Sequence, residues 1–248
     1  MQCLSSLGRE VQVSHYCSRH VQHFSTMRCD TGWGCGYRNA QMVISVLNTL
    51  PQYKERLGFD GQIPSVPKLQ ALIEESWAAG FDSVGAQQLG NRLQGSRKWI
   101  GTTEFAALLL WRRIKVEVVD FHRATETDSK HPLLFNYLWE YFSHPPAIGG
   151  QEALPPVYIQ HEGHSRTVVG VERYKNGEIR LIIFDPSHYR SRMNQIKRGS
   201  KASDLQILRK RLHDMRKDQF QLLVVRGLVE NDTDYEAYKT HIPLTRIP

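Results

Sequence analysis

The strongest constraint on this sequence is a cysteine between two glycines, at the point where an irregular segment gives way to a predicted helix at 38–48. Cys35 lies between Gly34 and Gly36. Unpaired N–H groups and the helix dipole favour a thiolate at a helix N-terminus, and flanking glycines allow a substrate to approach closely. The segment therefore predicts a cysteine nucleophile. The alternative is a buried cysteine that serves as a small apolar residue.

Composition and cysteine placement indicate the class of protein and the cellular compartment to expect. The chain has 248 residues, 40% hydrophobic and 23% charged, which fits a globular protein of one large domain or two small ones. It has no apolar run of about 18 residues, which excludes a membrane-spanning helix, and no signal-peptide core at its start. We therefore expect an intracellular protein, cytoplasmic and nuclear. Reduced thiols are expected because the cysteines gather near the N-terminus: Cys3, Cys17, Cys29 and Cys35.

Hydrophobic periodicity predicts helices first and strands later. The expected helices are 38–48, 66–79, 85–93, 102–112, 132–143 and 203–217, and the expected strands are 116–121, 157–160, 165–172, 180–185 and 219–226. Asn176-Gly177 indicates a hairpin between two of the strands. This order predicts an α+β fold whose N-terminal helical part, with the nucleophile helix, packs on an antiparallel sheet. We expect a single domain over 1–248, with 1–28 as an N-terminal extension.

A thiol nucleophile needs a base and a group that orients it. His164 begins a predicted strand, and Asp185 ends the next one, beyond the hairpin. Neighbouring antiparallel strands can present these two positions side by side. His188 is the competing base, because it follows the same Asp185-Pro186 pair. Either residue also has a plain structural interpretation, His164 as a bonded loop histidine and Asp185 as a turn former.

The tetrahedral oxyanion of an acyl transfer needs hydrogen-bond donors. The backbone N–H of Cys35 is one candidate, and the side-chain amide of Gln160, four residues before His164, is another. His23 is a weaker candidate. Gln160 would have no such role if it pointed outward from its strand.

Three motifs in this sequence are distinctive: Gly32-Trp33-Gly34-Cys35-Gly36-Tyr37-Arg38-Asn39, residues 160–170 from Gln160 to Gly170, and Phe184-Asp185-Pro186. Together they resemble the ZUFSP-type peptidases, zinc-finger-containing deubiquitinases related to the peptidases of the ubiquitin-fold modifier. Shorter matches extend the resemblance over nearly the whole chain, at 77–81, 93–95, 99–101, 119–122 and 247–248.

The resemblance implies a papain-like cysteine peptidase that cleaves after the terminal Gly-Gly of ubiquitin in polyubiquitin. By position it implies Cys35 as nucleophile, His164 as general base, Asp185 as orienter and Gln160 as oxyanion donor. The related modifier peptidases use a histidine directly after Asp-Pro, whereas His188 here is one residue further on. The choice of base stays open on this point. Alternatives are a peptidase for another ubiquitin-like modifier and an inactive ubiquitin-binding module.

A ubiquitin tail carries arginines, so its groove needs acidic partners. Asp82 and Glu104 match acidic positions of the family, although each could instead cap a helix. Trp99 could form a wall of the groove, or lie in the core. Trp33 is assigned to substrate binding with its loop, whose glycines leave room for the Gly-Gly tail.

The family usually carries N-terminal zinc fingers, and this sequence has none. Cys17, His20, His23 and Cys29 are metal-capable residues, but their spacing is tighter than in a finger. We expect no metal and no cofactor. The net charge of +7 includes a basic segment at 190–217, which predicts either a solvated helix face or weak nucleic-acid contact.

Overall fold

The fold is built on a mixed sheet in the computed structural model, which describes residues 10–145, 154–197 and 202–248. The strand order is β6-β5-β4-β3-β7-β2-β8, with β1 paired to β4, and only the β2–β8 pairing is parallel. The strands are β1 (Val11–Tyr16), β2 (Ile114–Phe121), β3 (Val157–His161), β4 (His164–Tyr174), β5 (Ile179–Phe184), β6 (Arg209–Lys210), β7 (Phe220–Leu228) and β8 (Leu244–Ile247).

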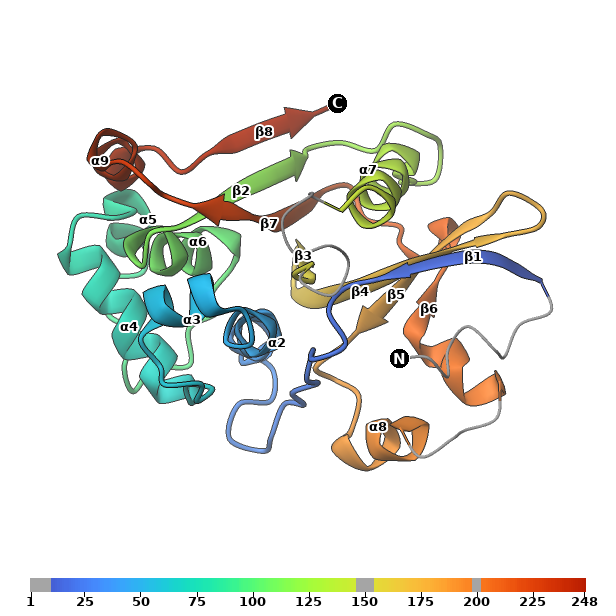
Figure 1. Cartoon of the computed structure of the whole chain (residues 1–248), viewed down its shortest axis with the longest axis horizontal. Coiled ribbons are helices and arrows are strands. Elements are labelled where there is room, and N and C mark those ends of the chain that lie inside the picture. The colour runs from blue at the N-terminus through green and yellow to red at the C-terminus, as the bar shows by residue number, and fades with distance from the viewer. Residues whose placement is uncertain (1–9, 146–153, 198–201) are drawn as a thin grey trace.

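The helices of the N-terminal half gather on one side of the sheet (Figure 1). They are α2 (Cys35–Leu47), α3 (Pro51–Leu57), α4 (Val66–Ala78), α5 (Ser83–Gln88) and α6 (Thr102–Trp111). The later helices are α7 (Pro132–Ser143), α8 (Arg190–Lys197) and α9 (Asp232–Thr240). Helix α2 packs on β4 and β3, α6 packs on β2 and β7, and α7 packs on β4, β5 and β1. The predicted α+β arrangement is therefore confirmed.

Two apolar cores lie on either side of α2. One joins the sheet to α7, with Met42 and Val46 of α2 among its members, and the other joins α2 to α4 and α6 through Tyr37 and Ile44. Because the residues of α2 from Gly36 to Leu47 are all buried, the helix is fixed between both cores. Its first residue is therefore held in a definite position relative to the sheet.

The two glycines beside Cys35 are needed for close packing. A Cβ on Gly34 would lie 2.7 Å from the Cβ of Asp30, and a Cβ on Gly36 would collide with the carbonyl oxygen of Ile100. Larger residues at either position would push α2 away from its neighbours.

The predicted helix at 203–217 is wrong. The chain forms instead a 3₁₀ helix (Ala202–Leu208), β6, and a further 3₁₀ turn (Leu212–Asp214). Strand β6 pairs with β5, and the guanidinium of Arg209 is buried against Glu172. Tertiary pairing therefore overrides local helix propensity in this segment.

The structure contains several elements that the sequence analysis does not predict: β1, α3, α8, α9 and β8. The predicted helix at 85–93 ends earlier, at Gln88, since Gly90 and Asn91 adopt positive φ. Residues 10–28, expected in an N-terminal extension, contribute β1 to the sheet. None of the helices in the described part of the chain is long and apolar enough to cross a membrane.

Candidate active site

Cys35 is the first residue of α2, and its half-buried side chain is a free thiol. Burial raises the pKa of this thiol, but hydrogen bonds with His164 and Ser165 outweigh that effect and leave the pKa below its ordinary value. The thiolate is therefore favoured, as a nucleophile requires.

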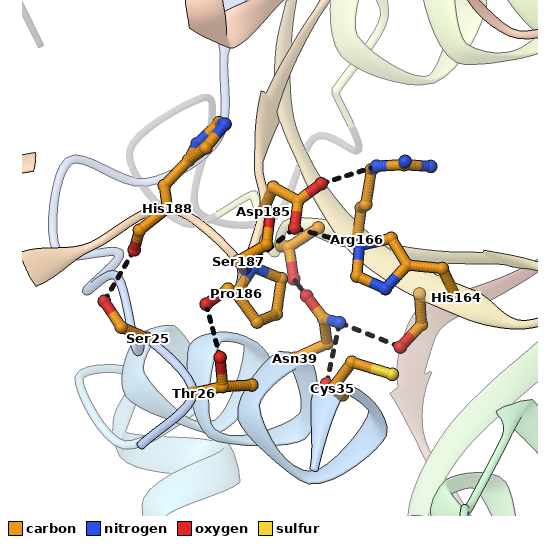
Figure 2. A network of polar contacts seen from close by, with 12 residues as sticks. Ser25, Thr26, Cys35, Asn39, His164, Arg166, Asp185, Pro186, Ser187 and His188 are labelled. Carbon is orange, nitrogen blue, oxygen red and sulfur yellow. Dashed lines mark hydrogen bonds and ion pairs between the residues drawn. The ribbon is translucent and has the colours of Figure 1, made fainter. Parts of the chain in front are cut away.

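His164 begins β4 directly after a two-residue turn from β3, in which Gly163 has a φ of 84°, and its side chain contacts Cys35 at the start of α2. Its Nε2 lies 2.9 Å from Oδ1 of Asp185, which leaves the other ring nitrogen for Cys35 (Figure 2). Burial lowers the pKa of His164, but the bonds to Asp185 and Cys35 raise it to about 9. The two shifts together favour a thiolate–imidazolium pair.

Asp185 follows β5 and is almost fully buried. Burial raises the pKa of its carboxyl group, but the bond to His164 and the backbone N–H of Ser187 hold it well below the usual range. The carboxylate therefore stays ionised and can hold the imidazole in one orientation.

Arg166 completes the partners of this carboxylate, and sequence reasoning missed it. Its Nε donates to Oδ2 of Asp185 at 2.7 Å. The register of β4 and β5 pairs Thr167 with Phe184, so one step further along the strands Arg166 faces Asp185. Strand alternation is the sequence signal that could have identified Arg166, because it comes two residues after His164 and lies on the same face of the strand.

Arg166 also reaches a second histidine. Its Nη1 lies 3.0 Å from Nε2 of His161, whose Nδ1 lies 2.7 Å from the carbonyl oxygen of Glu162. A carbonyl only accepts, so Nδ1 carries the hydrogen and Nε2 accepts from the guanidinium. Burial lowers the pKa of His161, which agrees with a neutral ring.

The ring of His188 lies away from the Asp185 carboxylate (Figure 2). The contacts of His188 with this loop are made by its backbone, which donates to the Asp185 carbonyl and accepts from the Ser25 hydroxyl. Of the two candidate bases, the structure brings His164 onto Asp185 and Cys35.

Residues 23–26 bind the backbone of the loop that carries Asp185. His23 Nε2 lies 2.8 Å from the carbonyl oxygen of Asp185, and the N–H of Thr26 donates to Pro186 at 2.8 Å. His23, a weaker candidate for the oxyanion, is thus placed against the backbone of this loop.

Gln160 lies with Cys35 and His164 in the wall of a cleft of about 380 Å³. Its Oε1 accepts from the N–H of Thr102 at 3.1 Å, which fixes the orientation of the amide. Its Nε2 donates to Gln221 at 3.0 Å and reaches the Thr102 hydroxyl only at 3.4 Å. Gln160 therefore faces the cleft rather than pointing outward, with one N–H weakly engaged.

The acidic candidates are both helix caps. Asp82 accepts from the N–H of Gly85 at the start of α5, and burial raises its pKa to about 6. Glu104 accepts from the N–H of Gly101 at 2.6 Å, at the start of α6. Neither belongs to the wall of the cleft.

The two tryptophans differ in exposure. Trp99 is 51% exposed and lines the cleft beside Cys35, so it is not a core residue. The indole N–H of Trp33 donates to the carbonyl of Cys29, and its ring packs edge-on against Tyr37. Trp33 therefore supports the loop that precedes Cys35.

The metal-capable residues of the N-terminal segment are not gathered into one site. Cys17 is buried, whereas Cys29 is exposed. Across 10–145, 154–197 and 202–248, no group of three or more His, Cys, Asp or Glu side chains is placed to hold a metal ion.

Residues 10–223 match Peptidase family C78. The chain is 43% identical over 213 residues to zinc finger-containing ubiquitin peptidase 1 of Homo sapiens, covering 84% of this chain and 36% of that protein. It is 34% identical over 198 residues to ubiquitin carboxyl-terminal hydrolase mug105 of Schizosaccharomyces pombe, covering 76% of each.

The chain thus spans about a third of the length of the mammalian relatives it matches. Among solved structures, UfSP from C. elegans superposes with a TM-score of 0.57 at 18% identity, covering 89% of this chain and 35% of that one. This likeness confirms the papain-like fold. With most of its length matched by the family and its cysteine, histidine and aspartate brought together, the chain belongs to peptidase family C78.

Proposed function

We propose that this chain is a thiol isopeptidase that cleaves after the C-terminal Gly-Gly of ubiquitin in polyubiquitin. The observation that carries the proposal is the arrangement of Cys35, His164 and Asp185 at the cleft, with the thiol pKa lowered and the imidazole pKa raised. The names of the two curated relatives, both ubiquitin peptidases, support the choice of substrate.

In the proposed mechanism the Cys35 thiolate attacks the carbonyl carbon of the terminal glycine. The protonated His164 then gives its proton to the leaving lysine amine, and the C–N bond breaks to leave a thioester on Cys35. Water, deprotonated by His164, attacks the thioester and releases the ubiquitin carboxylate. Asp185 holds the ring throughout and stabilises its charged form.

The oxyanion of each tetrahedral intermediate would be bound by two donors. The first is the backbone N–H of Cys35, which lies at the N-terminus of α2. The second is the Nε2 hydrogen of Gln160 that reaches Thr102 only at 3.4 Å, since this bond is weak enough to be exchanged for a bond to substrate.

Recognition of the tail would fall to the cleft. Trp99 offers an exposed aromatic face beside Cys35, against which the two terminal glycines would lie. Asp82 and Glu104 remain proposed partners of the tail arginines, and to serve they would have to share their carboxylates with the helix ends they cap. Trp33 would act by supporting the loop that faces the tail.

A ubiquitin probe with a C-terminal electrophile tests the proposal. We expect the wild-type chain to form a covalent adduct and Cys35→Ala to form none. Cys29→Ala is the matched control, because Cys29 is an exposed free thiol that the mechanism does not use. An adduct that survives in Cys35→Ala, or disappears in Cys29→Ala, contradicts the assignment.

The second candidate is a peptidase for another ubiquitin-like modifier, favoured by the structural likeness to UfSP. Parallel probes built on ubiquitin and on the ubiquitin-fold modifier separate the two, with the faster adduct identifying the substrate. An inactive ubiquitin-binding module would bind ubiquitin and form no adduct with either probe.

Nucleic-acid contact through 190–217 stays a prediction, as does a cytoplasmic and nuclear location. Within the described part of that segment, Arg209 is buried against Glu172, while Arg192 and Arg211 pair with Asp204 and Asp214. The charge open to a phosphate backbone is therefore smaller than the sequence suggests, and a salt-dependent DNA shift assay measures it.

A further inference from the structure

A buried chain of hydrogen bonds joins the first turn of α2 to β4, beside the nucleophile. Its centre is Asn39, one helical turn after Cys35 and fully buried. Asn39 Nδ2 donates to the carbonyl oxygen of Cys35 at 2.8 Å and to the hydroxyl of Ser165 at 3.0 Å. Its Oδ1 accepts from the hydroxyl of Thr167 at 2.7 Å.

The donor directions in this chain are fixed by chemistry. The carbonyl of Cys35 can only accept, so the amide group facing it is the nitrogen of Asn39. The second hydrogen of that nitrogen goes to Ser165 Oγ, which therefore acts as an acceptor there. The hydroxyl of Ser165 must direct its own hydrogen elsewhere.

Two groups compete for the Ser165 hydrogen. One is the sulfur of Cys35, which lines the same cleft, and the pKa of that thiol is lowered by the Ser165 hydroxyl and N–H acting against burial. The other is the hydroxyl of Tyr158. Burial raises the pKa of Tyr158 and the Ser165 hydroxyl acts to lower it, but the Tyr158 hydroxyl forms no hydrogen bond of acceptable geometry in the described part of the chain. A charged sulfur is the stronger acceptor of the two.

We propose that Ser165 is a further catalytic residue of this site, whose hydroxyl donates to the Cys35 thiolate, and that Asn39 is the positioning residue that turns this hydroxyl towards the sulfur. The inference rests on the proposed thiol chemistry but not on the identity of the substrate. Ser165 is 3% exposed, so its hydrogen bond to sulfur is shielded from competing water.

The rate at which iodoacetamide alkylates Cys35 as a function of pH tests this proposal in the full chain, with peptide mass spectrometry separating Cys35 from the other cysteines. Ser165→Ala removes one oxygen and is expected to raise the alkylation midpoint by about 1–2 pH units, as the loss of a hydrogen bond to a charged group predicts. Ser165→Thr keeps the hydroxyl and is expected to restore the midpoint.

Two variants serve as references. Ser76→Ala removes a hydroxyl that is equally buried but bonds within α4, and it should leave the midpoint unchanged. Tyr158→Phe should also leave it unchanged. An unchanged midpoint in Ser165→Ala, or a shift in Tyr158→Phe with none in Ser165→Ala, overturns the proposal.

A double-variant comparison tests the positioning role of Asn39. Asn39→Ala should raise the midpoint while Ser165 is present and cause no further rise in Ser165→Ala, because no hydroxyl is left to orient. Additive shifts would contradict the role of Asn39. Alkylation by iodoacetamide does not require ubiquitin. A failure of ubiquitin cleavage can therefore be distinguished from a failure of this proposal.

Discussion

His164 and Asp185 are 21 positions apart in sequence, yet Nε2 of the imidazole lies 2.9 Å from Oδ1 of the carboxylate. The β4–β5 hairpin returns the chain alongside itself, and the opposite oxygen of the same carboxylate binds Arg166. Asp185 therefore joins two cations from one strand. This arrangement holds the carboxylate from both sides and fixes the imidazole that faces Cys35.

The choice of base gives the first prediction. His164→Ala should lower kcat/KM for ubiquitin cleavage by about 10²- to 10⁴-fold, the range expected for loss of a general acid–base group. His188→Ala should leave kcat/KM nearly unchanged, because only its backbone contacts the Asp185 loop. If His188→Ala alone abolishes turnover while the circular dichroism spectrum stays native, the assignment of the base is wrong.

Arg166 gives the second prediction. Arg166→Met removes the cation from Oδ2 of Asp185 and should lower the free energy of unfolding by about 1–3 kcal/mol. It should lower kcat more than it changes KM, since Arg166 acts on the imidazole through Asp185. Arg180→Met, at the Glu178 pair near the hairpin, is the control. A changed KM with an unchanged kcat would instead indicate direct contact with substrate.

The buried ion pair between Glu172 and Arg209 gives the third prediction. Their side chains are 0% and 4% exposed, and two hydrogen bonds of 2.7 and 2.9 Å join them. Arg209→Met should lower the free energy of unfolding by about 3–5 kcal/mol, because it leaves a buried carboxylate without its cation. The exposed pair of Lys239 and Glu236 is the reference, and Lys239→Met should barely move the urea midpoint. Equal effects of the two variants would contradict this reasoning.

The pH dependence of stability gives the fourth prediction. The His164 pKa rises on folding from 6.5 to about 9, so its stabilisation is complete below about pH 6.5 and is lost as pH rises through about 9. The lowered pKa of Cys35 acts in the opposite sense: its stabilisation is complete above 9.0 and is lost as pH falls through the folded value. The two slopes therefore oppose each other in the wild-type chain.

Cys35→Ala removes one of these slopes and should reveal the other. We expect its free energy of unfolding, measured in urea from about pH 6.5 to 9, to fall with rising pH more steeply than that of the wild type. The double variant Cys35→Ala/His164→Ala should lack this fall. A wild-type slope as steep as that of Cys35→Ala would show that thiol and imidazole do not form an ion pair.

Much of the local structure could be read from the sequence. The sequence predicts a helix over 66–79 and α4 covers Val66–Ala78, because hydrophobic periodicity and a proline near the helix start are local signals. The Asn176-Gly177 turn formed the expected hairpin for the same reason. The segment at 203–217 failed because the burial of Arg209 against Glu172 spans 37 positions and leaves no local pattern.

The sequence by itself determined the nucleophile segment, the hairpin that returns Asp185 to His164, and the family motifs, because each depends on residues close together in the chain or joined by one turn. The tertiary structure alone decided that His164 rather than His188 faces Asp185, and that Asn39 meets Ser165 and Thr167. The contacts of Asn39 with Ser165 and Thr167 span 126 and 128 positions. They exist because α2, buried between two apolar cores, packs its first turn against β4, and a sequence pattern does not contain the relative placement of two packed layers.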